Sequence, residues 1–449
     1  MKITFIYPTM GRTQDVAHIR TWQMQPLGAA MLKAVTPKDW DFVFYDDRLE
    51  KIPYDQPTDL VGISVETYTA KRAYQIASEY RRRGVPVIMG GFHATLCSEE
   101  VAEYADSVCI GQGEGVWSTI LKDFREGNLK KIYHGGKPDI DGIIPDRSIF
   151  EGKRYLPIAL VETGRGCTFN CEFCAVQRFY NNTRVQRSLE DIKAELDNIK
   201  EKFIFFVDDN MLGNKSRSIE LLEYLSTKNF RWLTQTSINT AWDEDMLALM
   251  KKAGCNGVLI GLESFNQDNL RLMNKGVNLQ NIDYGSAVEQ FRKYGIWVYA
   301  TFLLGYDHDK ESDYQEYIEF ADKHRLGLCG FNHITPFPGT PLYDRLKKDG
   351  RLRFDKWWLD DKYRYDMIPY VPLAVSSSLV EETCLKLRKR FYGLRSLLWR
   401  SLDFKANIKD FTSFSIYWAT GLSMFRDVRK RDMLVLGDTS QDKELLKVK

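Results

Sequence analysis

The sequence contains little of what marks a membrane-spanning, nucleic-acid-binding or disulfide-rich protein. No segment of the 449 residues reaches 18 uninterrupted apolar residues, so a membrane-spanning helix is not expected. The formal net charge is only +2, and there is no arginine-rich tail or extended basic run, which argues against a nucleic-acid partner. No signal peptide is visible. Five of the eight cysteines are scattered in mostly apolar surroundings, so we expect buried thiols in a reducing cytoplasm (Cys97, Cys109, Cys255, Cys329 and Cys384).

The other three cysteines stand close together, and no fourth is near them. They occur in the run Cys167-Thr-Phe-Asn-Cys171-Glu-Phe-Cys174. Three thiolates can hold a [4Fe–4S] cube by three corners and leave the fourth iron open for a substrate. A structural zinc site is the alternative, but it needs four ligands, usually from two pairs. The nearest extra candidates, His134 and Cys255, are far away along the chain.

The cysteine run follows a predicted strand. The apolar segment 158–163 reads as a buried strand, and Gly164 and Gly166 allow a tight turn after it. Five more strand-like segments, alternating with helical patterns, predict a partial (β/α)6 TIM barrel: 203–207, 232–236, 257–262, 297–304 and 328–334. The three thiols therefore lie at the carboxyl end of a strand, where α/β proteins place their chemistry.

At these residues the chain resembles the radical S-adenosylmethionine (SAM) superfamily. The family motif is CxxxCxΦC with an aromatic Φ, and Cys167, Cys171, Phe173 and Cys174 match it in full. The resemblance implies a [4Fe–4S] cluster whose open iron chelates the amino and carboxylate groups of SAM. It also implies that an electron, supplied by a flavodoxin- or ferredoxin-type donor, cleaves SAM to methionine and a 5′-deoxyadenosyl radical.

The same resemblance suggests residues for SAM binding. Asp208 and Asp209 end the second barrel strand and could accept hydrogen bonds from the SAM ammonium group; the alternative is that they cap the helix that follows. Glu263 resembles the fourth-strand position that reaches the ribose or methionine part of SAM. Phe173 is expected to pack on the cluster, with its backbone near adenine.

Four further side chains are weaker candidates or open alternatives. Either Arg271 or Lys275 could pair with the SAM carboxylate, although solvation at the surface is expected for at least one of them. Thr236 and Asn239, at the end of the third barrel strand, are weaker candidates for SAM contacts.

Residues 1–140 alternate strand and helix patterns. Apolar runs at 3–7, 42–45, 60–64, 85–89 and 107–110, with helical segments such as 70–83 and 116–124, predict a doubly wound, Rossmann-like parallel sheet. Two glycine-rich runs follow strands, Gly90-Gly91-Phe92-His93-Ala94-Thr95 and Gly111-Gln112-Gly113-Glu114-Gly115. Such turns let a large ligand approach the backbone closely, although alone they could be ordinary tight turns.

Placed before a radical SAM core, this pattern resembles the cobalamin-binding domain of class B radical SAM methyltransferase-like enzymes. The resemblance rests on Ser64 and the two glycine runs, and it implies that the corrin lies over these strand ends, near Gly90, Gly91, Gly111, Gly113 and Glu114. The motif DxHxxG, which supplies a histidine to cobalt in other cobalamin proteins, is absent. His93 is a candidate at this site, but capping of the following helix is the favoured role. A domain that has lost the corrin is the alternative.

The C-terminal region is helical, aromatic and basic in pattern. We expect three domains: 1–140 for cobalamin, 141–340 for the radical SAM core, and 341–449 as a helical lid or substrate domain. The apolar segment 411–425 is too short to span a bilayer. A lid packed on the barrel rim is favoured; a peripheral membrane contact or a pocket for a hydrophobic substrate is the alternative. The polar segment 438–449 is expected to fray.

The expected function is C-methylation of an unactivated carbon in a small or hydrophobic metabolite, with a [4Fe–4S] cluster, SAM and cobalamin as cofactors. A cyclase or rearrangement enzyme with the same cofactors is the first alternative. A non-catalytic iron–sulfur protein for electron transfer or sensing is the second. A methylthiotransferase is not expected, because no further N-terminal cysteine trio is present. The substrate itself is not predicted.

Overall fold

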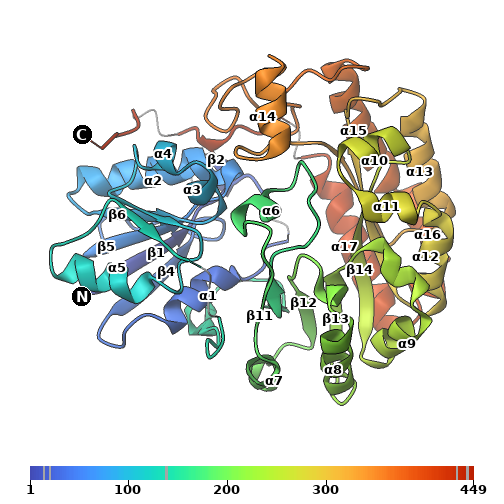
Figure 1. Cartoon of the computed structure of the whole chain (residues 1–449), viewed down its shortest axis with the longest axis horizontal. Coiled ribbons are helices and arrows are strands. Elements are labelled where there is room, and N and C mark those ends of the chain that lie inside the picture. The colour runs from blue at the N-terminus through green and yellow to red at the C-terminus, as the bar shows by residue number, and fades with distance from the viewer. Residues whose placement is uncertain (14–15, 20–21, 137–139, 431–432, 441–443, 449) are drawn as a thin grey trace.

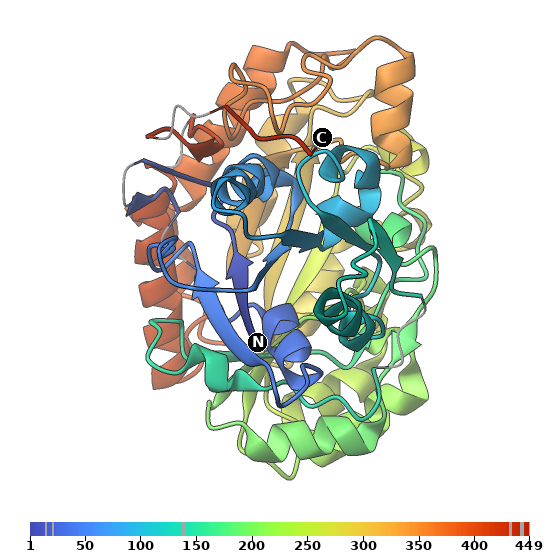
Figure 2. The same cartoon turned by 90° about the vertical axis from the view of Figure 1, so that its left-hand side faces the viewer.

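Two six-stranded parallel sheets form the body of the protein (Figure 1). The computed structural model describes residues 1–449 apart from 14–15, 20–21, 137–139, 431–432, 441–443 and 449. The first sheet lies on the left of Figure 1 and the second on the right. After a 90° turn, the first sheet stands in front of the second (Figure 2), so the two are neighbours along the long axis of the molecule.

The first sheet has the doubly wound arrangement that the sequence predicts. Its order is β4-β1-β5-β6-β7-β8, so the second strand along the chain lies at the edge beside the first. The strands are β1 Lys2–Tyr7, β4 Asp41–Asp46, β5 Leu60–Ser64, β6 Val87–Gly90, β7 Ser107–Ile110 and β8 Ile132–His134. The edge strand β8 is the one that the sequence does not predict.

Helices cover both faces of this sheet. One apolar cluster packs α1 (Leu27–Ala34) and α5 (Trp117–Arg125) against one face. A second cluster packs α2 (Ala70–Arg82), α3 (Phe92–Leu96) and α4 (Ser98–Val101) against the other. The carboxyl ends of the strands remain open toward the second sheet, which is where a doubly wound fold binds its ligand.

The second sheet is an open barrel with all six predicted strands. Its order, β16-β15-β14-β13-β12-β9, follows the chain, with β9 and β16 at the two edges. The strands are β9 Ile158–Val161, β12 Phe203–Phe206, β13 Arg231–Gln235, β14 Cys255–Glu263, β15 Trp297–Leu304 and β16 Leu328–His333. The helices between them are α7 Leu189–Asn198, α8 Lys215–Leu225, α9 Glu244–Lys252, α10 Gln267–Leu272, α11 Gly276–Gln280, α12 Tyr284–Lys293 and α13 Asp313–Lys323. The partial TIM barrel is therefore confirmed.

A long connection between β9 and β12 fills the space between the two sheets. It contains the short pair β10 (Gly164–Arg165) and β11 (Val185–Gln186) and the helix α6 (Ala175–Phe179). Figure 1 shows α6 between the first sheet and the barrel. The three clustered cysteines lie on the loop that leads from β10 into α6.

The C-terminal region is helical, as expected, and packs on the barrel. Its helices are α14 Pro341–Lys348, α15 Ser377–Phe391, α16 Leu394–Ser401 and α17 Phe411–Asp427. After α15, the hydroxyl of Tyr392 donates to the carbonyl of Cys329 in β16 at 3.0 Å. No helix in the described part of the chain is both long and apolar enough to cross a membrane. The domain boundaries at 140 and 340 stay predictions.

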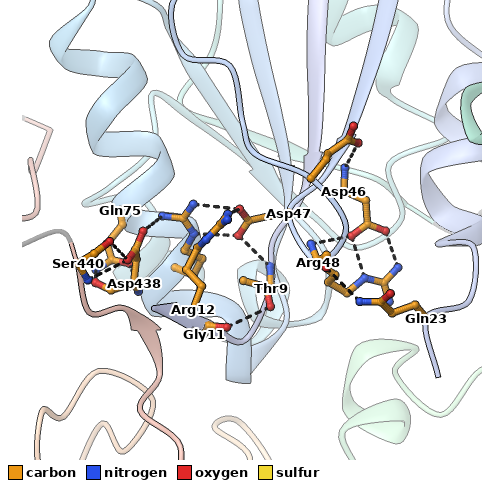
Figure 3. A network of polar contacts seen from close by, with 12 residues as sticks. Thr9, Gly11, Arg12, Gln23, Asp46, Asp47, Arg48, Gln75, Asp438 and Ser440 are labelled. Carbon is orange, nitrogen blue, oxygen red and sulfur yellow. Dashed lines mark hydrogen bonds and ion pairs between the residues drawn. The ribbon is translucent and has the colours of Figure 1, made fainter. Parts of the chain in front are cut away.

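The end of the chain returns to the first sheet. Strand β17 (Gly437–Asp438) pairs with β2 (Gly11–Thr13), which also pairs with β3 (Val16–Ala17). Figure 3 shows Asp438 beside Gln75, whose side-chain amide donates to the Asp438 carbonyl at 3.1 Å. Buried Arg72 also joins Asp438 to Asp47. The expectation of a frayed tail is therefore wrong for its start; residues 441–443 and 449 lie outside the described residues.

Candidate cofactor sites

The three cysteines of the motif lie close enough together on the loop before α6 to influence one another. Burial raises the pKa of Cys171 to about 11, and the neighbouring Cys174 and Cys167 contribute to this rise. Burial also raises the pKa of Cys174, while the backbone N–H groups of Gln177 and Val176 donate to its sulfur and oppose the rise. Because metal ligation requires thiolates, cluster binding here must release protons.

A single metal ion and an iron–sulfur cluster make different geometric demands on these thiols. Among the described residues, no three His, Cys, Asp or Glu side chains gather closely enough to hold one metal ion. A tetrahedral zinc ion would draw its sulfurs to within roughly 4 Å of one another, given a Zn–S bond of about 2.3 Å. A [4Fe–4S] cube places each of three thiolates on a different iron, so the sulfurs need not converge on one point.

The loop that carries the cysteines is held by contacts that do not use its sulfurs. The Glu172 carboxylate accepts from Arg345 of α14 at 2.7 Å and also from the hydroxyl of Tyr306. The backbone N–H of Glu172 donates to the carbonyl of Met273 at 3.1 Å. The loop is thus attached both to the barrel and to the C-terminal region, and all three thiols remain available to a cluster.

Asp208 and Asp209 support this loop from the end of β12. The Asp208 carboxylate accepts from the backbone N–H and the hydroxyl of Thr163, at 2.9 and 2.5 Å. Asp209 accepts from the N–H of Gly166 at 3.1 Å. Neither caps α8, because that role belongs to Asn214. Burial raises the pKa of Asp208 to about 6.

Glu263 and Lys275 form a buried ion pair beside the cysteines. Their charged atoms are 2.9 Å apart, and the Lys275 ammonium lies 5.8 Å from the ring centre of Phe173. Burial alone would lower the pKa of Lys275, but the Glu263 carboxylate and, to a lesser extent, Cys171 raise it overall. Glu263 has φ of 64°, a conformation that costs energy outside glycine and that occurs often at functional sites.

Three other predicted residues are not brought into this group. Arg271 faces solvent and pairs with Asp268 at 2.6 Å, so of the two candidate cations only Lys275 lies by the cluster loop. The Thr236 hydroxyl is buried and bonds to that of Thr240 at 2.8 Å. The Asn239 side chain accepts from Ser237 at 2.5 Å.

A cavity of about 280 Å³ lies between the carboxyl ends of the first sheet and the connection that carries the cysteines. Residues at or just beyond the strand ends of both sheets line it, together with residues of the connection. From the first sheet come, among others, Ser64, Glu66, Gly90, Gly91, Gly111, Gly113 and Glu114, and from the second side Glu162, Arg165, Phe179, Tyr180 and Val207. The predicted cobalamin residues are thus gathered around one cavity, with the exception of His93.

The first-sheet wall of this cavity requires glycine. Gly91 has φ of 103°, and a Cβ there would lie 2.9 Å from the carbonyl oxygen of Val65. A Cβ at Gly62 would lie 2.8 Å from the ring of Phe5. These positions keep backbone exposed along the cavity, which fits the close approach of a large planar ligand such as a corrin.

His93 points away from this cavity. It is fully buried, its Nε2 lies 3.2 Å from Glu100, and its ring packs edge-on against Trp358 at 5.4 Å. Its side chain does not cap α3. The side chain of His93 therefore neither lines the cavity nor caps the helix, the two roles expected from the sequence. The reason is that α3 turns its ring toward the interior of the protein.

Arg165 joins the two walls of the cavity. Its guanidinium donates to Glu114 of the first sheet and to Glu162 at the end of β9, both at 2.8 Å, and to Gln112 at 2.5 Å. Burial would raise the pKa of Glu114, but Arg165 lowers it overall. Burial raises the pKa of Glu162 to about 7 despite the contact with Arg165. The single guanidinium therefore offsets the effect of burial fully at Glu114 but not at Glu162.

Sequence reasoning predicted Glu114 but missed its neighbours Glu162 and Arg165. Glu162 and Arg165 flank the turn directly before Cys167, and their proximity to the motif was the available signal. Glu66, another lining carboxyl, has its pKa raised to about 7 by burial. A larger hollow of about 680 Å³ lies outside the barrel between α12 and α13, and it contains none of the predicted site residues.

Comparison with known proteins agrees with both sites. The model of the radical SAM superfamily matches residues 161–321, and that of the B12 binding domain matches residues 17–121. Bacteriochlorophyllide d C-8(2)-methyltransferase of Chlorobaculum tepidum is 30% identical over 399 residues, 84% of this chain and 87% of the relative. Anaerobic magnesium-protoporphyrin IX monomethyl ester cyclase of Cereibacter sphaeroides is 25% identical over 407 residues, 81% of this chain and 65% of the relative.

A solved structure has the same fold along nearly the whole chain. The radical S-adenosylmethionine methyltransferase TsrM from Kitasatospora setae, with cobalamin and [4Fe–4S] cluster bound, matches with a TM-score of 0.67 at 14% identity. The match covers 96% of this chain and 99% of TsrM. From the two family models and the relative that is 30% identical along most of both chains, it follows that this chain belongs to the cobalamin-binding radical SAM enzymes, whose cofactors are a [4Fe–4S] cluster, SAM and cobalamin.

Proposed function

We propose that this enzyme transfers a methyl group from SAM to an unactivated carbon of a hydrophobic, ring-bearing small molecule. One observation carries the proposal: a single loop serves both sites. Glu162 and Arg165 line the cavity, the cysteine motif begins at Cys167, and the chain returns to the cavity at Phe179 and Tyr180. Radical formation and methyl donation must occur next to one substrate, and this loop brings the two sites together.

The overall reaction balances with two molecules of SAM. When bound, the cluster with SAM supplies a 5′-deoxyadenosyl radical and cobalamin supplies the methyl group. One substrate C–H bond becomes a C–CH₃ bond, and two SAM cations and two electrons are consumed. The other products are S-adenosylhomocysteine, methionine and 5′-deoxyadenosine, which carries the substrate hydrogen.

The side chains of the protein hold and orient these groups. We assign Cys167, Cys171 and Cys174 to the cluster. The ion pair of Glu263 and Lys275 suits the polar groups of SAM, since a carboxylate can accept from two ribose hydroxyls and an ammonium can pair with a carboxylate.

Asp208 and Asp209 act by supporting the cysteine loop. Through Thr163 and Gly166 they fix the backbone directly before Cys167. The first-sheet glycines and Ser64, with Glu114 and Arg165, form the proposed cobalamin wall.

The substrate class rests on the relatives. The relative from Chlorobaculum tepidum is named as acting on bacteriochlorophyllide d, a hydrophobic ring-bearing molecule. Cyclisation is the second candidate, because the relative from Cereibacter sphaeroides is named as a cyclase. The proposed partners are a flavodoxin- or ferredoxin-type electron donor and, through the C-terminal helices, a membrane surface.

The experiment uses the anaerobically reconstituted chain with cobalamin, reductant and SAM labelled with deuterium in its methyl group. A panel of ring-bearing hydrophobic substrates is scored by mass spectrometry. Methyl transfer predicts a labelled methyl group in the product and one S-adenosylhomocysteine for each 5′-deoxyadenosine. Cyclisation predicts 5′-deoxyadenosine with no label in the product. If no 5′-deoxyadenosine forms, whether or not a substrate is present, both proposed reactions are contradicted.

The chain offers a matched control for this assay. Cys167→Ala is expected to abolish 5′-deoxyadenosine formation, because it removes one of three cluster ligands. Cys97→Ala removes another partly buried free cysteine, outside the motif, and is expected to retain activity. Equal loss in both variants would indicate a general effect on folding and would contradict the assignment.

A further inference from the structure

Helix α17 is inverted with respect to the usual pattern of a surface helix. Its inward side buries Ser413, Tyr417 and Gly421, which are small or polar. Its outward side exposes Phe411 by 82% and Phe414 by 45%. A surface helix normally turns its apolar stripe to the core and its polar side to water. Folding alone therefore gives no reason for the outward phenylalanines.

Helix α16 shows the same inversion. It buries the polar Ser396 and Arg400 beside Leu397, while Leu398 is 57% and Trp399 is 48% exposed. The buried Arg400 is held by backbone carbonyls, including that of Leu326 at 2.9 Å. The hydroxyl of Tyr417 in α17 donates to the carbonyl of Leu397 at 2.8 Å, and the Leu397 side chain packs against Gly421, so the two helices pack closely against each other.

The outward side chains form a concentrated apolar surface. Of 17 large hydrophobic side chains that are exposed in the described residues, eight fall within residues 394–422. This outer surface consists of Leu394, Leu398, Trp399, Leu402, Phe404, Phe411, Phe414 and Leu422. Figure 2 shows a long red helix of the C-terminal region along the left-hand outer edge of the molecule. Apolar surface gathered in this way marks an interaction site rather than ordinary surface variation.

The charges around this surface are positive. Residues 394–430 contain seven Lys and Arg but only three acidic residues, all aspartates. Asp403 is 1% exposed and pairs with Arg292, and Asp427 is buried. The Asp410 side chain is 38% exposed, but its charge is paired with Arg231 at 3.0 Å. The exposed cations are Arg395, Lys405, Arg426, Arg429 and Lys430.

We propose that the outer surface of α16 and α17 docks on an anionic lipid bilayer. Leucine, tryptophan and phenylalanine side chains flanked by lysine and arginine are the composition of helices that lie in a membrane interface. The cations would face anionic headgroups while the apolar side chains enter the acyl boundary. A protein partner would fit the apolar side chains equally well, but the excess of exposed cations around them favours an anionic lipid surface. The inference does not depend on the proposed reaction.

The test is flotation of the full chain with vesicles of phosphatidylcholine alone or with added phosphatidylglycerol. We expect binding to the anionic vesicles and weaker binding as salt is raised. The double variant Phe411→Ser/Phe414→Ser should weaken binding by at least about tenfold for each phenylalanine, since each side chain would no longer be buried in the acyl boundary. Lys405→Glu/Arg426→Glu should weaken it by at least about fivefold for each position.

Val371→Ser/Leu373→Ser is the matched control, because those side chains are 50% and 67% exposed outside the two helices. Its vesicle binding should equal that of the native chain. Circular dichroism of every variant checks that the fold persists. The proposal is overturned if the native chain binds neither vesicle, or if the Phe411→Ser/Phe414→Ser variant binds as tightly as the native chain. Equal binding to both vesicles, or a native dimer that this variant converts to a monomer, would also overturn it.

Discussion

Replacing Arg165 by methionine should destabilise the protein in a pH-dependent way. Arg165 is the cation shared by Glu114 and Glu162, whose side chains are only 7% and 14% exposed. Removing one partner from a buried ion pair typically costs about 3–5 kcal/mol, because a charge remains without compensation. The structure allows a more specific figure for this cavity.

Glu66 shows how burial affects a carboxyl in the same cavity when no cation opposes it. Burial raises its pKa from 4.5 to about 7. In the Arg165→Met variant burial acts on Glu114 without opposition, so we expect its pKa to rise above the ordinary value, as that of Glu66 does. A rise like that of Glu66 corresponds to about 3 kcal/mol at neutral pH and above. The midpoint of thermal unfolding should then fall by roughly 5–10 °C.

The sign of the pH dependence follows from proton linkage. In the native chain the pKa of Glu114 lies below its unfolded value, so the ionised group stabilises the fold above about pH 4.5 and loses this contribution in acid. In the variant the folded pKa exceeds the unfolded value, so stability falls as pH rises from about 4.5 to 7. The deficit relative to the native chain should be full above pH 7 and shrink toward pH 4.5.

Two controls accompany the thermal scans. Adding Glu114→Gln to Arg165→Met removes one of the two carboxylates that have lost their cation and should restore part of the lost stability, since Glu162 still lacks its partner. Arg271→Met removes an exposed arginine paired with Asp268 and should change stability by less than about 1 kcal/mol. A deficit of equal size at pH 5 and pH 8, or a further loss on adding Glu114→Gln, would refute the reasoning.

Three further predictions concern other parts of the structure. Gly91→Ala should weaken cobalamin binding and cost about 1–3 kcal/mol, because its Cβ would meet the Val65 carbonyl at 2.9 Å in a conformation reserved for glycine; equilibrium dialysis with cobalamin and thermal scans measure both. Lys275→Met should raise the Kd of SAM for the reconstituted cluster at least about tenfold while iron content is kept, and an unchanged Kd would remove Lys275 from the SAM site. Asp438→Ala should lower the thermal midpoint and increase proteolysis of the C-terminal tail, because Arg72 loses one buried partner; a tail that stays protected would contradict this.

The sequence was sufficient for the two sheets because their strands are short apolar runs with regular helical spacing. Strand β8 escaped prediction, since Ile132–His134 is a three-residue edge strand with exposed ends and little hydrophobic signal. The packing of the C-terminal tail at Asp438 could not be predicted either. Asp438 is polar, and its burial depends on Arg72, some 366 residues away along the chain. Such long-range ion pairs leave no local pattern.

The site residues likewise divide into those with a local sequence pattern and those whose position depends on distant contacts. The cysteines and the glycine runs could be predicted because their spacing is local. The choice between Arg271 and Lys275 could not, because it depends on the break after α10, where Asn274 adopts φ of 56° and turns Lys275 toward Glu263. His93 lies within a correctly predicted run, yet its ring turns inward because Glu100 and Trp358 bind it there.

The most direct test of the account is anaerobic reconstitution of the native chain with iron and sulfide, followed by electron paramagnetic resonance of the reduced protein with and without SAM. We predict about four iron atoms per chain and a signal that changes when SAM is added, since SAM should occupy the iron that the three thiolates leave open. Zinc in place of iron, or a cluster whose signal is unaffected by SAM, would contradict it.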